Sequence, residues 1–146
     1  MKRTAQLVLA TLAAALIATS ASSADAGKTY YPKKGKPFSS TVKIGDYVYV
    51  AGVAGASADG TIPKDFVAQA TNSMNGVAAY LKLAGATMDD VYRCTVALTN
   101  MDNWDAFNSV YVKYFKEGHY PVRMSYGVTS LGGSDVEVQC EAHVGK

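Results

Sequence analysis

Arg123 is the residue of this sequence best suited to binding a small anion. It follows Tyr120-Pro121-Val122 and opens a β-prone run, so we expect it at the mouth of a strand beside a proline-containing turn. Its planar guanidinium can donate two parallel hydrogen bonds to one carboxylate. A solvated arginine at a sheet edge, or one in a salt bridge between subunits, fits the same context, and position alone leaves these alternatives open.

Other polar residues give weaker signals. Asn108 lies among apolar neighbours in a helical stretch, where a buried amide needs a partner, so we expect it to hold a loop backbone. Ser125 has no base beside it in sequence, which argues against a catalytic triad. Glu137, Gln139 and Glu141 alternate along one strand and therefore share one face, toward water or a cleft.

The elements that position these residues follow from apolar periodicity and turn residues. Short β-prone runs at 41–44 and 47–52 predict a hairpin, and residues 53–64 predict a loop. Asp65 is the expected N-cap of a helix that Gly85 ends, and Asp102 the expected cap of a second helix that Gly118 ends.

Further strands are expected at 91–98, 122–128 and 135–144, which gives the order β-β-α-β-α-β-β. This order predicts an α+β two-layer sandwich with two helices on one face of a mixed sheet. The other face would be bare, and several of its side chains are apolar or aromatic. Since monomers rarely expose such a patch, we expect a homo-oligomer.

The first 26 residues have the layout of a signal peptide. Lys2 and Arg3 precede an apolar run at 7–18, and small residues follow up to Ala24-Asp25-Ala26. A membrane anchor is the alternative, but the run is short for the roughly 20 residues that span a bilayer. We expect cleavage after Ala26 or after Ala24, a periplasmic or secreted protein, and no membrane segment after cleavage. Residues 27–35 then form a flexible arm, and residues 36–146 one domain.

Net charge, motifs and cysteine content limit which partners and cofactors we expect. The net charge of +2 is too small to favour nucleic acid as a partner. Neither a phosphate-binding motif nor a metal-ligand spacing is present, so we expect no metal and no cofactor. Cys94 and Cys140 lie in apolar, strand-like runs. We favour two free buried thiols, with a disulfide as the alternative that an exported protein permits.

Several motifs, taken in order, resemble those of the RidA/YjgF family. The resemblance covers residues 36–144. Its parts are Lys36-Pro37-Phe38-Ser39-Ser40, Gly45-Asp46, Tyr49-Val50-Ala51-Gly52, Gln69 with Asn75, Leu83-Ala84-Gly85-Ala86, Asn100-Met101-Asp102 through Asn108 and Tyr111, Pro121-Val122-Arg123, and Val138-Gln139-Cys140-Glu141-Ala142.

The resemblance implies a chorismate-mutase-like fold and a homotrimer with ligand clefts between subunits. It also implies hydrolytic deamination of 2-aminoacrylate-type enamines and imines to 2-keto acids and ammonia, without a cofactor. An enzyme with that activity is a 2-iminobutanoate/2-iminopropanoate deaminase. Arg123 would hold the substrate carboxylate, and Gly52 would let the backbone approach the ligand. The expected substrate-binding residues are Phe38, Gly52, Asn108, Ser125 and Glu141.

The sequence departs from the family pattern near the expected water site. Gln139 stands where many members carry a glutamate; glutamine cannot act as a base, although it can orient a water. A shifted loop would bring Glu137 or Glu141 into play instead. Phe38 replaces a tyrosine, and Ser125 a frequent cysteine. These differences keep a second hypothesis open, that of a non-catalytic trimer that binds small carboxylates or other metabolites.

Overall fold

The computed structural model describes residues 27–145, so the expected signal peptide lies outside the described part of the chain. The helices are α1 (Phe66–Leu83) and α2 (Trp104–Tyr111), with 3-10 turns η1 (Met88–Asp90), η2 (Met101–Asn103) and η3 (Val112–Tyr114). The strands are β1 (Lys28–Pro32), β2 (Ser39–Ile44), β3 (Tyr47–Val50), β4 (Val53–Ala54), β5 (Val91–Leu98), β6 (Val122–Gly127) and β7 (Val136–His143).

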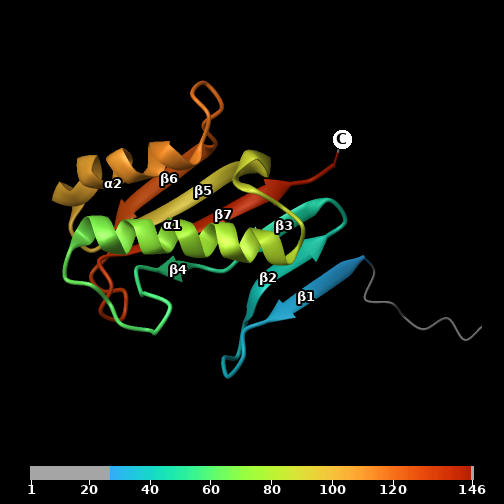
Figure 1. Cartoon of the computed structure of the whole chain (residues 1–146), viewed down its shortest axis with the longest axis horizontal. Coiled ribbons are helices and arrows are strands. Elements are labelled where there is room, and N and C mark those ends of the chain that lie inside the picture. The colour runs from blue at the N-terminus through green and yellow to red at the C-terminus, as the bar shows by residue number, and fades with distance from the viewer. Residues whose placement is uncertain (1–26, 146) are drawn as a thin grey trace, which may run out of the picture.

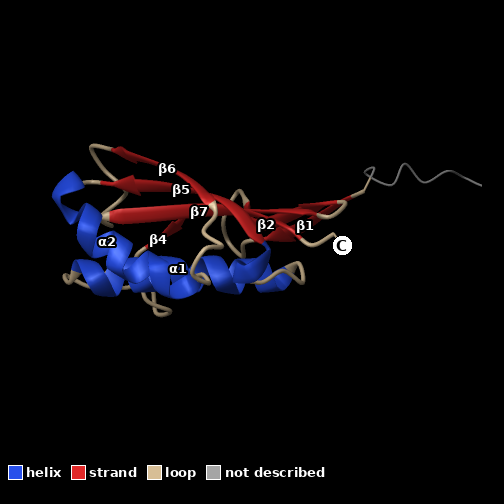
Figure 2. Ribbon diagram, turned by 90° about the horizontal axis from the view of Figure 1, so that it is seen from above, coloured by secondary structure: helices blue, strands red, loops and turns tan. Residues whose placement is uncertain are grey.

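The strands form one open mixed sheet in the order β1-β2-β3-β7-β5-β6, and the short β4 pairs with β7 (Figure 1). Only β5 and β6 are parallel, as expected for two strands joined through a helix. Both helices pack on the same face of the sheet (Figure 2). The predicted α+β two-layer sandwich is therefore confirmed.

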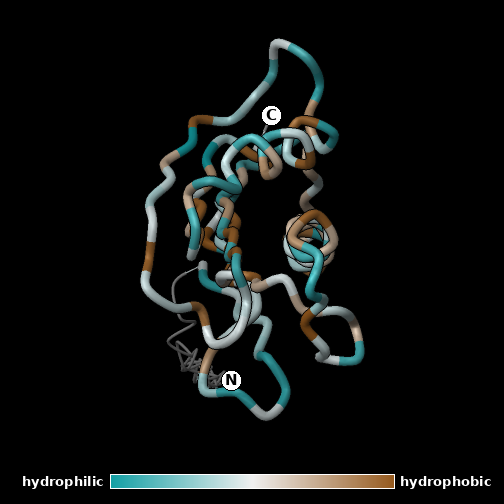
Figure 3. The backbone as a smooth tube through the Cα atoms, turned by 90° about the vertical axis from the view of Figure 1, so that its left-hand side faces the viewer, coloured by the Kyte–Doolittle hydropathy of each residue, from teal (hydrophilic) through white to brown (hydrophobic). Residues whose placement is uncertain are grey.

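The first helix follows the predicted signals, and the second does not. The Asp65 carboxylate accepts a hydrogen bond from the Ala68 amide at 2.7 Å, and Gly85 after the helix has φ +79°. Figure 3 views α1 nearly along its axis, beside the sheet whose core face it covers. Asp102, the expected cap of the second helix, lies instead inside turn η2. Asn100 caps that turn by accepting a bond from the Asp102 amide.

We predicted a flexible arm at residues 27–35. The structure differs at Lys28–Pro32, which forms edge strand β1. Tyr30 pairs with Val42 and Tyr31 with Thr41 of β2. Threonine and tyrosine favour strands, and the edge of β2 offers unpaired amides and carbonyls that β1 satisfies. The predicted loop at 53–64 likewise begins with two residues, β4, that pair with β7.

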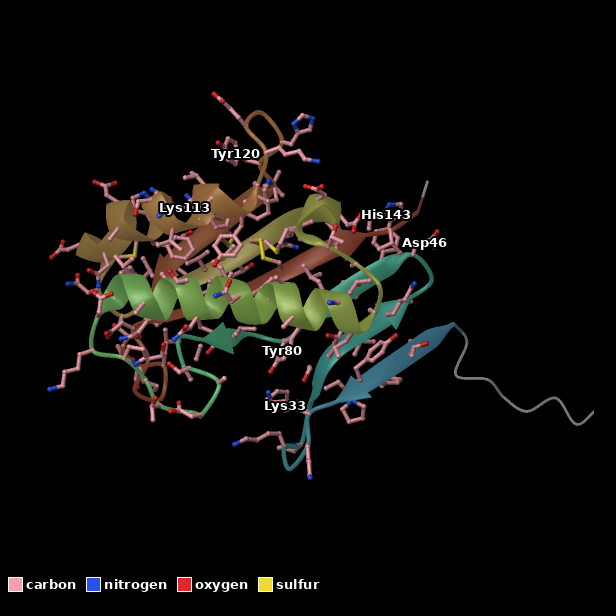
Figure 4. All side chains as sticks on the ribbon, in the orientation of Figure 1. Lys33, Asp46, Tyr80, Lys113, Tyr120 and His143 are labelled. Atoms are coloured by element: carbon pink, nitrogen blue, oxygen red, sulfur yellow. A yellow bond between two sulfur atoms is a disulfide. The ribbon has the colours of Figure 1, made fainter. Side chains whose placement is uncertain are left out.

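The expectation of two free thiols is also wrong. Cys94 of β5 and Cys140 of β7 are directly opposite each other in the antiparallel ladder and form a disulfide, drawn in yellow in Figure 4. Both cysteines are buried in the core between sheet and helices. Cross-strand neighbours bring their Cβ atoms within bonding reach, which sequence spacing does not reveal.

The face of the sheet away from the helices carries exposed aromatic and apolar side chains, as predicted. They include Tyr47, Tyr49, Val122, Met124 and Tyr126. Monomers rarely leave large apolar patches in water, so this face is suited to contact with another chain. Among residues 27–145, no helix is long and apolar enough to cross a membrane.

Candidate active site

Arg123 lies on edge strand β6 with its side chain on the helix-covered face. Along β6 the exposed Val122, Met124 and Tyr126 alternate with the half-buried Arg123 and Ser125. Since successive strand side chains point to opposite faces, Arg123 and Ser125 point toward α2. The strand thus places the guanidinium between the sheet edge and the second helix.

Three aromatic rings of α2 surround the Arg123 guanidinium. Its Cζ lies 4.6 Å from the ring centroids of both Trp104 and Tyr111, and 5.8 Å from that of Phe107. The spacing of three and four residues brings these rings to one side of the helix. Cation–π contacts of this kind hold the plane of a guanidinium and leave its N–H edges available.

The sequence alone did not identify these rings as neighbours of Arg123. Trp104, Phe107 and Tyr111 belong to the predicted apolar stripe of the second helix, which is typical of core packing. The available signal was the combination of a tryptophan at the helix start, Trp104, with an arginine on a following strand. Recognising it requires knowing that β6 lies next to α2.

Within residues 27–145, no acidic side chain forms an ion pair with Arg123. The ion pairs within residues 27–145 are Arg93–Glu141 and Lys116–Asp89. A cavity of about 300 Å³ lies beside the guanidinium and is lined by Asn108, Tyr111, Val112, Tyr120, Pro121 and Arg123. The loop that carries Tyr120 rises from the end of α2 at the rim of the molecule (Figure 4). A half-buried cation with unused donors and an adjacent cavity is suited to binding an anion.

Asn108 and Ser125 lie on the same side of the sheet as Arg123. Asn108 lines the same cavity. Ser125 does not line it; its hydroxyl is buried and has no hydrogen-bond partner in the described chain.

The remaining expected site residues lie elsewhere. Glu137, Gln139 and Glu141 alternate with the buried residues of β7 and therefore point to the open face, opposite to Arg123. Phe38, which is 48% exposed, lies between β1 and β2, at the other edge of the sheet from β6. The expected site residues therefore fall into two separate groups within one chain, one around Arg123 and one on the open face around Glu137.

The second half is organised around Gly52 and Glu137. A Cβ atom built on Gly52 would collide with the Glu137 carboxylate, so this glycine lets the carboxylate lie against the backbone after β3. Gly52 was expected to let its backbone approach a ligand. In this chain the space beside Gly52 is occupied by the Glu137 carboxylate. Gln139 is exposed, while the Glu141 carboxylate accepts a hydrogen bond of 2.8 Å from Tyr92 and pairs with Arg93 at 3.7 Å.

A buried hydrogen-bond network fixes the start of β7 and hence Glu137. Gln69 of α1 accepts a 2.7 Å bond from the Asp135 amide and donates a 3.0 Å bond to its carboxylate. The Ser134 hydroxyl donates to the Val136 carbonyl at 2.7 Å and accepts from the Gly55 amide at 2.9 Å. These bonds tie the turn before β7 to the helix and to the segment after β4, so the Gly52–Glu137 half has a rigid support.

Comparisons with known proteins agree with this architecture. The profile of the family described as endoribonuclease L-PSP matches residues 29–144. A 2-iminobutanoate/2-iminopropanoate deaminase of Mus musculus is 31% identical over 109 residues, which are 73% of this chain and 80% of the mouse protein. A RutC family protein of Pyrococcus abyssi is 34% identical over 113 residues, which are 76% of this chain and 87% of that protein.

Solved structures show the same fold. RidA from an Antarctic Psychrobacter has a TM-score of 0.71 at 27% identity, over 79% of this chain and 94% of that one. Escherichia coli TdcF with bound serine has a TM-score of 0.70 at 28% identity, over 78% and 93% of the two chains. With nearly all of the described residues matched by one family profile, this chain belongs to the endoribonuclease L-PSP family, the RidA/YjgF family that its motifs resemble.

Proposed function

We propose that this protein is a hydrolytic deaminase of small enamine and imine carboxylates, and that Arg123 holds the substrate carboxylate. One observation carries the proposal: the Arg123 guanidinium is held by aromatic rings beside a cavity, with no carboxylate partner in the described chain. Relatives named 2-iminobutanoate/2-iminopropanoate deaminase support the reaction. The serine bound to TdcF, an amino acid with a carboxylate, supports the ligand class.

The reaction consumes one water per imine. An enamine such as 2-aminoacrylate becomes the iminium form when its terminal carbon takes up a proton. Water adds to the iminium carbon and loses a proton to a base, which gives a tetrahedral carbinolamine. The nitrogen then takes up a proton, the C–N bond breaks as the hydroxyl loses its proton to the base and becomes the carbonyl, and a 2-keto acid and ammonia leave. Arg123 positions the carboxylate, and the base must stand close to the attacking water.

We assign the water-activating role in this proposal to Glu137. Gln139, the residue that the family alignment favoured, cannot accept a proton at neutral pH. Glu137 is a carboxylate and can accept a proton. It lies against Gly52, the glycine that we expected next to the ligand, so a substrate bound there would be close to this carboxylate. Glu141 is engaged by Tyr92 and Arg93 and is therefore less available.

The two halves of the site must come from different chains in this account. Arg123 and Glu137 point to opposite faces of one sheet, so a single chain cannot bring them to one substrate. We propose a homotrimer in which the exposed aromatic faces pack together and the Arg123 edge of one chain meets the Gly52–Glu137 half of its neighbour.

The Cys94–Cys140 bridge supports the further proposal of export, because disulfides persist in oxidising compartments.

Turnover of an imine generated in place tests the proposal. An amino-acid oxidase or a PLP-dependent lyase supplies 2-iminopropanoate or 2-aminoacrylate, and semicarbazide trapping reports how fast the imine disappears. The wild type should accelerate its loss. Arg123→Ala should lower kcat/KM about 100-fold or more through the lost charged hydrogen bonds, and Glu137→Gln should lower kcat about 100-fold or more through the lost base.

Gln139→Ala is the matched control on the same strand face. Activity that survives Gln139→Ala but not Glu137→Gln supports the assignment, and the reverse result returns the role to Gln139. A wild type that binds 2-keto acids through Arg123 and yet never accelerates imine loss would refute the deaminase and leave the non-catalytic binder.

A further inference from the structure

The hydroxyl group of Tyr111 has no hydrogen-bond partner within the described chain. Tyr111 is the last residue of α2 and is only 3% exposed. Its ring is packed by Phe107 and Phe115, at centroid distances of 5.6 and 4.8 Å. Nearly all buried polar groups in folded proteins are hydrogen-bonded, so the unpartnered hydroxyl of Tyr111 can take a partner from outside the chain.

The surroundings of Tyr111 indicate what that partner is. Its ring lines the cavity beside Arg123, and the guanidinium carbon lies 4.6 Å from the ring centroid. The Ser125 hydroxyl also has no partner in the described chain and lies on the same face of β6 as Arg123, but Ser125 does not line the cavity. The Arg123 guanidinium and the Tyr111 hydroxyl are donors without an acceptor in the described chain, and a carboxylate supplies two acceptor oxygens.

The protonation state of Tyr111 fits a donor. Burial raises the pKa of Tyr111 to about 12, although the nearby positive charge of Arg123 acts in the opposite direction. The phenol therefore keeps its proton throughout the neutral range and can give a hydrogen bond to an anion, whereas a phenolate could not.

We propose that Tyr111 is a substrate-binding residue whose hydroxyl donates a hydrogen bond to the carboxylate held by Arg123. This inference rests on the proposed function, because it assumes that a carboxylate occupies the Arg123 cavity. It adds a second role to Tyr111: the ring stacks on the guanidinium, and the oxygen contacts the ligand. An aromatic residue that only packed the core would not need this oxygen.

Tyr111→Phe tests the inference, because it keeps the ring and removes only the oxygen. Pyruvate, a 2-keto acid product, is the probe. Calorimetric titration gives its affinity, and emission of Trp104, the one tryptophan of the sequence, reports occupancy beside Arg123. We expect Tyr111→Phe to weaken pyruvate binding about ten-fold, the effect of one hydrogen bond to a charged group. Without ligand it should be at least as stable as the wild type, since it loses an unsatisfied buried hydroxyl.

Tyr114→Phe is the matched control. The Tyr114 hydroxyl donates a 2.8 Å bond to the Asn75 side chain, and Tyr114 does not line the cavity. This variant should lose stability and keep the affinity for pyruvate, which is the opposite pattern to Tyr111→Phe.

The outcomes separate the inference from the proposed function. Unchanged pyruvate affinity in Tyr111→Phe, with binding lost in Arg123→Ala, overturns the inference and leaves the proposed function standing. If Tyr111→Phe binds pyruvate more weakly and also has a lower melting temperature without ligand, the Tyr111 oxygen supports the fold. This result also overturns the inference. Equal pyruvate affinity in the wild type and Arg123→Ala, or no binding by the wild type, removes the proposed function and the inference with it.

Discussion

Breaking the Cys94–Cys140 bridge should lower the free energy of unfolding by about 4 kcal/mol. The two cysteines are 46 residues apart in sequence, so the bond closes a long loop in the unfolded chain. The chain-entropy relation for a loop of this size gives roughly 13 cal/mol/K, or about 4 kcal/mol at 25 °C. For a domain of this length that loss corresponds to a melting temperature roughly 10–20 °C lower.

Urea unfolding of three samples measures the effect: the oxidised wild type, the wild type refolded under a phosphine reductant, and the variant Cys94→Ala/Cys140→Ala. All are compared at one protein concentration, because oligomer stability depends on it. The reductant should destabilise the wild type and leave the variant unchanged. Two titratable thiols in the native protein, or a difference below about 1 kcal/mol between oxidised and reduced wild type, would refute the reasoning.

Four further predictions concern the site. Gly52→Ala should displace the Glu137 carboxylate and lower kcat at least ten-fold while circular dichroism stays native, and normal turnover would contradict the contact. Arg123→Lys, which loses the bidentate geometry, should raise the dissociation constant for pyruvate about ten-fold in a fluorescence titration. Gln69→Leu should cost about 2–4 kcal/mol in urea unfolding, because it leaves the Asp135 amide and the Pro63 carbonyl without their Gln69 partner. The raised pKa of Tyr111 means that the folded state binds the phenolic proton more tightly than the unfolded state. Stability should therefore fall as pH rises from about 10 to 12, by up to about 3 kcal/mol, and Tyr111→Phe should flatten that fall in pH-dependent melting.

Local signals in the sequence predicted most of the elements. Asp65 and Gly85 bracketed α1 because capping depends on a few neighbouring residues. The alternation of apolar residues predicted the strands β5, β6 and β7. It also predicted that one face of the sheet is left open. Strand β1 was missed because its residues acquire their partners only when the edge of β2 is present.

The site was less predictable because it depends on register and on strand order. Cys94 and Cys140 meet because they are opposite each other in one ladder, and their sequence spacing gives no sign of this. The choice between Glu137 and Gln139 depends on the length of the turn before β7, and pairing of Ala54 with Glu137 brings Glu137 to Gly52. Arg123 could be identified from its type and context, but its aromatic neighbours required the packing of α2 against β6.

Mixed trimers test the central claim most directly, namely that Arg123 of one chain and Glu137 of another form one deaminase site. Arg123→Ala and Glu137→Gln chains with different tags are co-expressed, and assemblies carrying both tags are isolated. In any mixed trimer one site of the three takes an intact arginine from one chain and an intact glutamate from its neighbour, so about one third of wild-type imine turnover should return although each variant alone is inactive. Mixed trimers as inactive as either variant alone would contradict the account.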